Sequence, residues 1–105
     1  MVLQRNALRT YALAYLRNDE ASAQRRTIER YVTLHGIKVL RWYEDKHTQY
    51  KQQKHMLEAL TRSIDPIDYV LVHDAFALGK TQSRVRSVSR HCMLCGAQVI
   101  YTSRA

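Results

Sequence analysis

The sequence contains few residues that break regular structure and few that could crosslink the chain. In 105 residues there are one proline, three glycines and two cysteines. So little proline and glycine argues against long disordered tracts. The length suits one domain with a core of its own, so residues 1–105 are expected to form a single domain.

Long apolar runs are absent as well. No stretch approaches the ~20 residues that a membrane span requires. The first residues, Met-Val-Leu-Gln-Arg-Asn, lack the apolar region of a secretory signal. We therefore expect a cytoplasmic protein with no membrane partner. In that compartment Cys92 and Cys95 are expected to be thiols and not a structural disulfide.

Acidic residues are scarce relative to basic ones. Nine Asp and Glu stand against seventeen Lys and Arg, which gives a net charge of +8. Such a balance favours polyanionic partners, which are nucleic acid, an acidic membrane surface or an acidic protein. A solvated basic surface without a partner is the other interpretation. Nothing in the sequence calls for a cofactor, and none is expected.

Short apolar runs predict four strands. Residues 11–17 form an almost unbroken apolar run that ends in Arg-Asn-Asp-Glu, which is typical of a strand buried on both faces. Arg17 would then lie at the carboxyl end of this strand, where open α/β sheets bind ligands; alternatively it only marks where the strand meets water. The other predicted strands are residues 37–43, 69–72 and 98–101.

Helical spacing of apolar residues predicts a helix between each pair of strands. The first runs through Ile28 and His35, ends near Gly36, and places Gln24 on its wetter face. A polar loop is expected at 44–51, and a loop at 73–79 is expected to lead into the third helix. Strands that alternate with helices predict a three-layer α/β/α fold with a mostly parallel four-stranded sheet in the order 2-1-3-4. The inward residues expected on the second and third helices are Met56, Leu57, Leu60, Ile64, Val85, Val88 and Cys92.

Several segments resemble a known family when they are taken in order. They are Tyr15-Leu-Arg17, the helix from Ala23 to Tyr31, Gly36, Asp45-Lys46 and Val70-Leu-Val72. Their order and spacing are similar to those of the catalytic domain of serine site-specific recombinases (resolvases and invertases), over roughly residues 10 to 103. The resemblance implies a resolvase-like domain with residues 1–9 as an N-terminal extension. The long dimerisation helix and helix-turn-helix domain of the family are expected to be missing.

The resemblance also implies a site, which this sequence has altered. Arg17 matches the family's phosphate-binding arginine, and Asp45 matches an acidic position of the family. Asp19 stands where the family has its nucleophilic serine. Phe76 and Ala77 replace an Asp and an Arg, Lys80 replaces a further arginine, and another family arginine aligns near Gln53. A chain without the nucleophile and most of the arginines is expected to be an inactive pseudo-recombinase.

Basic residues on the third predicted helix are candidates for nucleic-acid contact. Lys80 and Arg84, and Arg86 and Arg90, are spaced as two rows on a helix, and Arg104 lies beyond them. With Arg17, these side chains could contact phosphates, or the rows could form an ordinary solvated face. No aromatic platform for stacking single-stranded bases is apparent, so any binding is expected to be weak and non-specific.

His91, Cys92 and Cys95 form the remaining candidate site, a C-x-x-C beside a histidine. Core packing of Cys92 is the favoured interpretation, because this residue continues the stripe of Val85 and Val88. Zinc binding lacks an obvious second pair of ligands. Redox chemistry lacks the helix N-terminus that stabilises a thiolate.

These observations lead to three functional hypotheses. The first is a non-catalytic recombinase-like domain that regulates or assists a DNA transaction of a mobile element, phage or plasmid, with DNA, a recombinase or another protein as partner. The second is a small basic protein that uses the fold to bind RNA or a protein. The third is a residual DNA strand-transfer enzyme. The sequence does not indicate an oligomeric state.

Overall fold

Four parallel strands form the centre of the protein. The computed structural model describes residues 10–17, 20–46 and 49–104. The strands lie side by side in the order β2-β1-β3-β4, and each neighbouring pair is parallel. The predicted fold class and strand order are therefore confirmed. The strands are β1 (Thr10–Arg17), β2 (Ile37–Asp45), β3 (Tyr69–Val72) and β4 (Gln98–Tyr101).

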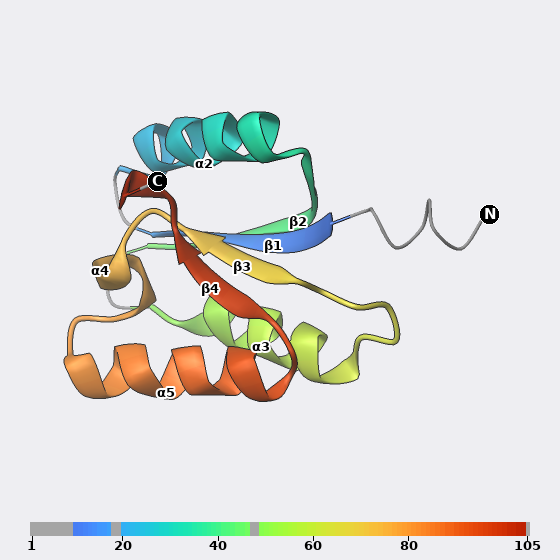
Figure 1. The fold of residues 1–105 in the computed structure, drawn as a ribbon. Coiled ribbons are helices and arrows are strands. Elements are labelled where there is room, and N and C mark those ends of the chain that lie inside the picture. The colour runs from blue at the N-terminus through green and yellow to red at the C-terminus, as the bar shows by residue number, and fades with distance from the viewer. Residues whose placement is uncertain (1–9, 18–19, 47–48, 105) are drawn as a thin grey trace.

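Helices cover both faces of this sheet (Figure 1). One face carries α2 (Ala21–His35), and the other carries α3 (Lys51–Arg62) and α5 (Gln82–Leu94). A short helix, α4 (Ala75–Leu78), lies between β3 and α5, and a 3₁₀ turn, η1 (Thr102–Arg104), follows β4. No helix of residues 10–17, 20–46 and 49–104 is long and apolar enough to cross a membrane.

The alternation of side chains along β1 divides the core into two clusters. Leu13 and Tyr15 face α3 and α5, whereas Ala12, Ala14 and Leu16 face α2. All five are buried, because β1 is a central strand with a helical layer on each side. The strand predicted to be buried on both faces is confirmed.

The register of β1 and β2 determines where the polar groups at their ends meet. The pairing shifts by one residue between Ala12 and Leu13, and beyond this irregularity Arg17 is opposite Asp45. The carboxyl ends of parallel strands share one edge of the sheet. Two residues that are 28 positions apart in the sequence are thereby neighbours.

Several local predictions are wrong. The loop predicted at 73–79 contains the short helix α4. Ile64 is 99% exposed beyond the end of α3, so it is not an inward helical residue. The loop predicted at 44–51 is shorter, because β2 continues through Asp45 and α3 begins at Lys51. Lys80 precedes α5, which begins at Gln82 after the Thr81 hydroxyl accepts a hydrogen bond from the Arg84 amide. Lys80 and Arg84 therefore do not form a helical row.

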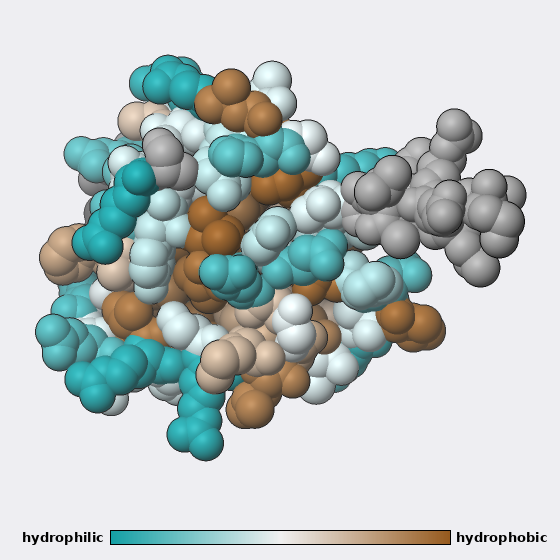
Figure 2. Space-filling view, in the orientation of Figure 1, coloured by the Kyte–Doolittle hydropathy of each residue, from teal (hydrophilic) through white to brown (hydrophobic). Residues whose placement is uncertain are grey.

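The surface over the edge strand β4 is partly apolar. In the view of Figure 2, apolar surface crosses the region where β4 lies in Figure 1, with hydrophilic side chains above and below it. β4 is paired only with β3 among the described strands. Met93 and Leu94, near the end of α5, are exposed large apolar residues.

Candidate functional site

The site is built around Arg17, whose side chain is buried at the carboxyl end of β1. Arg17 is only 1% exposed. Its Nη1 donates a hydrogen bond to the Tyr15 hydroxyl at 2.8 Å, and that hydroxyl donates to Asp45 Oδ2 at 2.7 Å. Tyr15 thus connects a guanidinium to a carboxylate that lies on the neighbouring strand. A buried charge needs such partners to be stable.

Asp45 also holds the start of α3. Its Oδ1 accepts a hydrogen bond from the Gln52 amide at 2.9 Å, and Oδ2 accepts one from the Gln53 amide at 2.8 Å. These are amides of the first helical turn, which have no acceptor within the helix. A carboxylate at this end is also favoured by the helix dipole. Asp45 is therefore both a member of the buried network and a cap for α3.

Gln53 extends the network to α5. Its Nε2 donates to the Leu78 carbonyl at 2.8 Å, while its Oε1 accepts from Arg84 Nε at 3.2 Å and from Arg84 Nη2 at 2.6 Å. Gly79 leaves room for this arginine, because a Cβ at Gly79 would lie only 2.7 Å from Arg84 Cγ. Gln53 is fully buried and links three helices through one side-chain amide.

Tyr50 lies between the two arginines of the site. The Arg17 Cζ is 3.8 Å from the centroid of the Tyr50 ring, and the Arg84 Cζ is 3.5 Å from it. Both distances are those of cation–π contacts. A ring that contacts both guanidinium groups supplies electron density to two cations that would otherwise repel each other. Tyr50 therefore occupies space that an anion bound to both arginines would need.

The environment of Tyr15 changes its acid–base behaviour. Burial, and then the hydrogen bond to Asp45, raise the pKa of the Tyr15 hydroxyl. The nearby Arg17 opposes this shift but does not cancel it. The hydroxyl therefore keeps its proton and remains a donor to Asp45 and an acceptor from Arg17.

Gln24 is a further member of the site and corrects a prediction. It is buried, not on the wetter face of α2, and its Oε1 accepts a hydrogen bond from the Arg17 amide at 3.0 Å. The sequence contained a signal for this position, because Gln24 is four residues before the buried Ile28 on the same helical face. Gln24 was nevertheless predicted on the wetter face because its side chain is polar.

The structure separates the predicted site residues into two groups. Arg17 and Asp45 lie in the buried network, and Asp19 lies outside the described residues. Ala77 is buried, whereas Phe76 and Lys80 are exposed.

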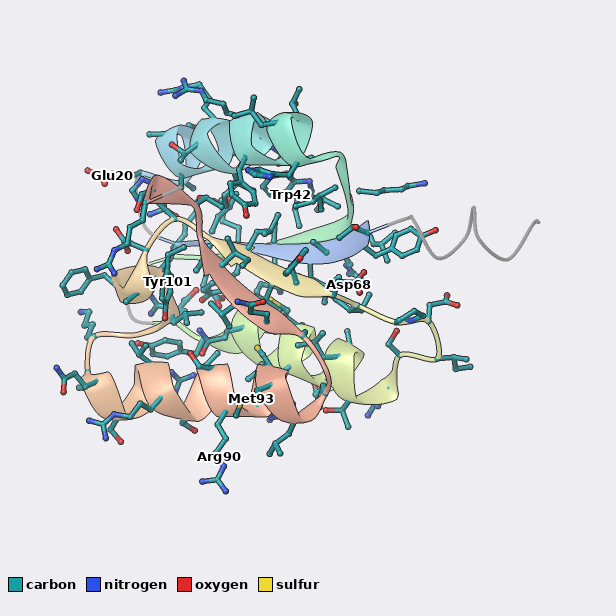
Figure 3. All side chains as sticks on the ribbon, in the orientation of Figure 1. Glu20, Trp42, Asp68, Arg90, Met93 and Tyr101 are labelled. Carbon is teal, nitrogen blue, oxygen red and sulfur yellow. The ribbon has the colours of Figure 1, made fainter. Side chains whose placement is uncertain are left out.

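The predicted basic surface is also divided. Arg84 is half-buried and points into the network, so it does not belong to a solvated row. Its predicted contact with nucleic acid stays a prediction. Arg86, Arg90 and Arg104 are exposed. Figure 3 shows Arg90 extending from α5 away from the body of the protein. The nucleic-acid role of these arginines stays a prediction.

Tyr50 and Arg84 were not predicted to belong to the buried network, for different reasons. Nothing in a polar segment such as 49–51 indicates that its tyrosine will contact two arginines. Arg84 was noticed as a cation, but the sequence does not say that the chain turns at Gly79 and Lys80 before α5 begins. Gly79, whose missing Cβ leaves room for Arg84, was the local hint of this turn.

The cysteines lie at the carboxyl end of α5. Cys92 is fully buried in the core cluster that includes Val88, as the apolar stripe predicted, and Cys95 is half-buried. The His91 ring lies 3.0 Å from the Thr61 hydroxyl and 3.2 Å from the Leu57 carbonyl oxygen. Among the residues that the structure describes, no three His, Cys, Asp or Glu side chains are grouped as metal ligands would be.

The two thiols are expected to differ in reactivity. Burial raises the pKa of the Cys92 thiol to about 12, and thiolate is the reactive form. Iodoacetamide at neutral pH should therefore alkylate Cys95 and spare Cys92 in the folded protein, while both react in urea. Mass spectrometry of tryptic peptides measures this difference. Equal alkylation of both thiols in the folded state would contradict this difference.

Cys92→Ser should also lower the free energy of unfolding by about 1–3 kcal/mol, because it buries a hydroxyl.

Comparison with solved structures identifies the fold as that of serine recombinase catalytic domains. A site-specific recombinase of the resolvase family from Streptococcus pneumoniae superposes with a TM-score of 0.84 at 16% identity, over 91% of this chain and 74% of that one. The C-terminal catalytic domain of ISC1926 TnpA, an IS607-like serine recombinase, gives 0.75 at 19% identity, over 88% and 67%. The N-terminal catalytic domain of TP901-1 integrase gives 0.78 at 13% identity, over 90% and 78%.

No protein-family model and no curated protein sequence matches the chain. At 13–19% identity, the similarity to the solved structures establishes the fold. The resemblance noted in the sequence is confirmed at this level, because the same class of domain emerges from the three-dimensional comparison.

Proposed function

We propose that this chain is a non-catalytic serine-recombinase-like domain that regulates or assists a DNA transaction. It would act through contacts to a protein partner, to the DNA backbone, or to both. A mobile element, phage or plasmid is the setting that the resemblance implies. The proposal combines the recombinase fold with a site that is poorly suited to phosphoryl transfer.

The observation that carries the proposal is the burial of Arg17. Its guanidinium is hydrogen-bonded to Tyr15 and covered by the Tyr50 ring, and the residue is 1% exposed. An arginine that stabilises a scissile phosphate must present its donors to that phosphate. Here Tyr50 would first have to leave both Arg17 and Arg84.

The residues at the other positions of the family's site support the same conclusion. Asp19 would bring a negative charge close to a phosphate where a neutral hydroxyl nucleophile is needed. Phe76 and Ala77 offer no side-chain hydrogen-bond donor at positions where the family has Asp and Arg. Loss of a single oxyanion donor can reduce a rate by about 10²–10³-fold. Loss of the nucleophile together with two arginines leaves no efficient route to strand cleavage.

Incubation with supercoiled plasmid tests this proposal. The protein is expected to produce no nicked DNA and no covalent protein–DNA adduct after denaturation with detergent. Asp19→Ser should be equally inactive, because the arginines remain absent and Arg17 remains covered. An active recombinase of this fold on its own target plasmid serves as the positive control. A covalent adduct that maps to a serine or threonine of this chain would instead favour a residual strand-transfer enzyme.

A second candidate function is a small basic protein that binds RNA or a protein. The observation that favours it is the exposure of Met93 and Leu94, which are 68% and 75% exposed near the end of α5. Affinity capture from the native host, with and without nuclease treatment, separates the two candidates. Capture of one defined protein that survives nuclease and does not bind DNA would favour the second function.

A further inference from the structure

An open groove lies between α4, the beginning of α5 and η1. It has a volume of about 560 Å³. It is distinct from the buried network, because neither Arg17 nor Asp45 lines it. The side chains that give it its chemical character are Phe76, Lys80, Arg86 and Arg104.

Phe76 is exposed because of the way in which α4 is built. Asp74 caps this helix by accepting a hydrogen bond from the Ala77 amide, and Ala77 and Leu78 are turned into the core. The preceding position must then face outward, and Phe76 is 77% exposed. It is the single phenylalanine of the chain. An exposed aromatic ring lacks the stabilisation that burial would provide. Phe76 could gain it by contact with a ligand.

The charged side chains that line the groove with Phe76 in the described part of the chain are all positive. Lys80 comes from the loop before α5, Arg86 from α5 and Arg104 from η1. Among the residues that the structure describes, no acidic residue lines the groove. The nearest acidic residue in the sequence, Asp74, accepts a hydrogen bond from Ala77 and is 3.1 Å from His73 Nδ1. The groove thus combines an accessible aromatic face with three cations.

We propose that this groove binds single-stranded nucleic acid, with an unpaired base stacked on Phe76 and the flanking phosphates held by Lys80, Arg86 and Arg104. An aromatic face beside a positively charged track is the usual arrangement for single strands. A paired base is already stacked on both faces, so a duplex can use the cations but not the ring. The inference rests on the nucleic-acid contacts of the proposed function and specifies their form. It departs from the expectation that no stacking platform is present.

Paired titrations test the inference. A labelled single strand of about 16 nucleotides and its duplex are titrated at two salt concentrations. Phe76→Ala should weaken single-strand binding about tenfold or more and leave duplex binding unchanged. Phe76→Tyr should bind as the unaltered protein does. In a strand that contains 2-aminopurine, binding should quench the fluorescence of this base, and Phe76→Ala should abolish the quenching.

Two controls separate stacking from other effects. Leu94→Ala removes another exposed apolar side chain at the far end of α5 and should change neither affinity. Arg86→Gln should weaken single-strand and duplex binding alike and reduce their salt dependence, because it removes a phosphate contact. Unfolding curves confirm that each variant is folded.

Three results would overturn the inference. Equal loss of single-strand and duplex affinity in Phe76→Ala, or no loss in either, would show that the ring does not stack a base. If duplex binding persists in that case, the proposed DNA-associated function stands. If the protein binds neither form at low salt, the inference fails together with the DNA contacts. The plasmid assay tests the absence of catalysis separately.

Discussion

Asp45→Ala should lower the free energy of unfolding by about 3–5 kcal/mol. The Asp45 carboxylate is 3% exposed and accepts hydrogen bonds from Tyr15, Gln52 and Gln53. Removing it leaves one hydroxyl and two helix amides without their acceptor in a buried site. It also removes a buried negative charge that the Tyr15 hydroxyl links to Arg17. For a domain whose total stability is about 5–15 kcal/mol, such a loss is a large fraction.

Urea unfolding measures this change. The midpoint should fall while the slope of the free energy against urea is preserved. Asp65→Ala is the matched control, because Asp65 is an exposed acidic residue outside the network. That substitution should change stability by no more than about 0.5 kcal/mol. Similar midpoints for the two variants would show that the buried network does not stabilise the fold.

Raising the pH above about 10 should destabilise the protein steeply, and Tyr15→Phe should make the decline shallower. The unfolded state releases the Tyr15 proton near the ordinary pKa of tyrosine, whereas burial and Asp45 raise the pKa of Tyr15 in the folded state. The folded state therefore holds more protons than the unfolded state in this range. The free energy of unfolding falls as the pH rises, by about 1.4 kcal/mol per pH unit for one such group.

Cys92 provides an internal comparison for this experiment. The pKa of its thiol is raised to about 12 by burial, so it contributes to the decline from a lower pH than Tyr15 does. Cys92→Ala should flatten the curve between about pH 9 and 12, while Tyr15→Phe should flatten it from about pH 10 upward. The comparison uses slopes, so a general loss of stability in either variant does not affect it. Unaltered slopes in Tyr15→Phe would mean that Tyr15 ionises as freely in the folded protein as in the unfolded chain.

Local patterns were sufficient for the strands of the sheet. The apolar runs at 11–17, 69–72 and 98–101 correspond to strands of the structure. The alternation of strands and helices predicts that these strands are parallel. It does not by itself give their order, because β3 follows β2 in the chain but pairs with β1. The buried position of Cys92 was likewise predicted, since its spacing from Val88 places both on the inner face of α5.

Element boundaries near the site could not be predicted in the same way. α3 begins at Lys51 because Asp45, on a different element, accepts the amide hydrogens of its first turn. Lys80 lies outside α5 because the helix begins only after the Thr81 cap. Both boundaries depend on hydrogen bonds that form only when the elements are in place.

The nature of the site depends on contacts between residues that are distant in the sequence. The residue types at 17, 45, 76 and 77 indicated an altered recombinase-like site from the sequence. Tyr50 and Arg84 entered it only when β1, α3 and α5 were packed together. A side chain's spacing within its own helix or strand indicates whether it faces inward. It does not indicate which charge it will meet there, because that partner comes from another part of the chain and is placed by the packing of the whole domain.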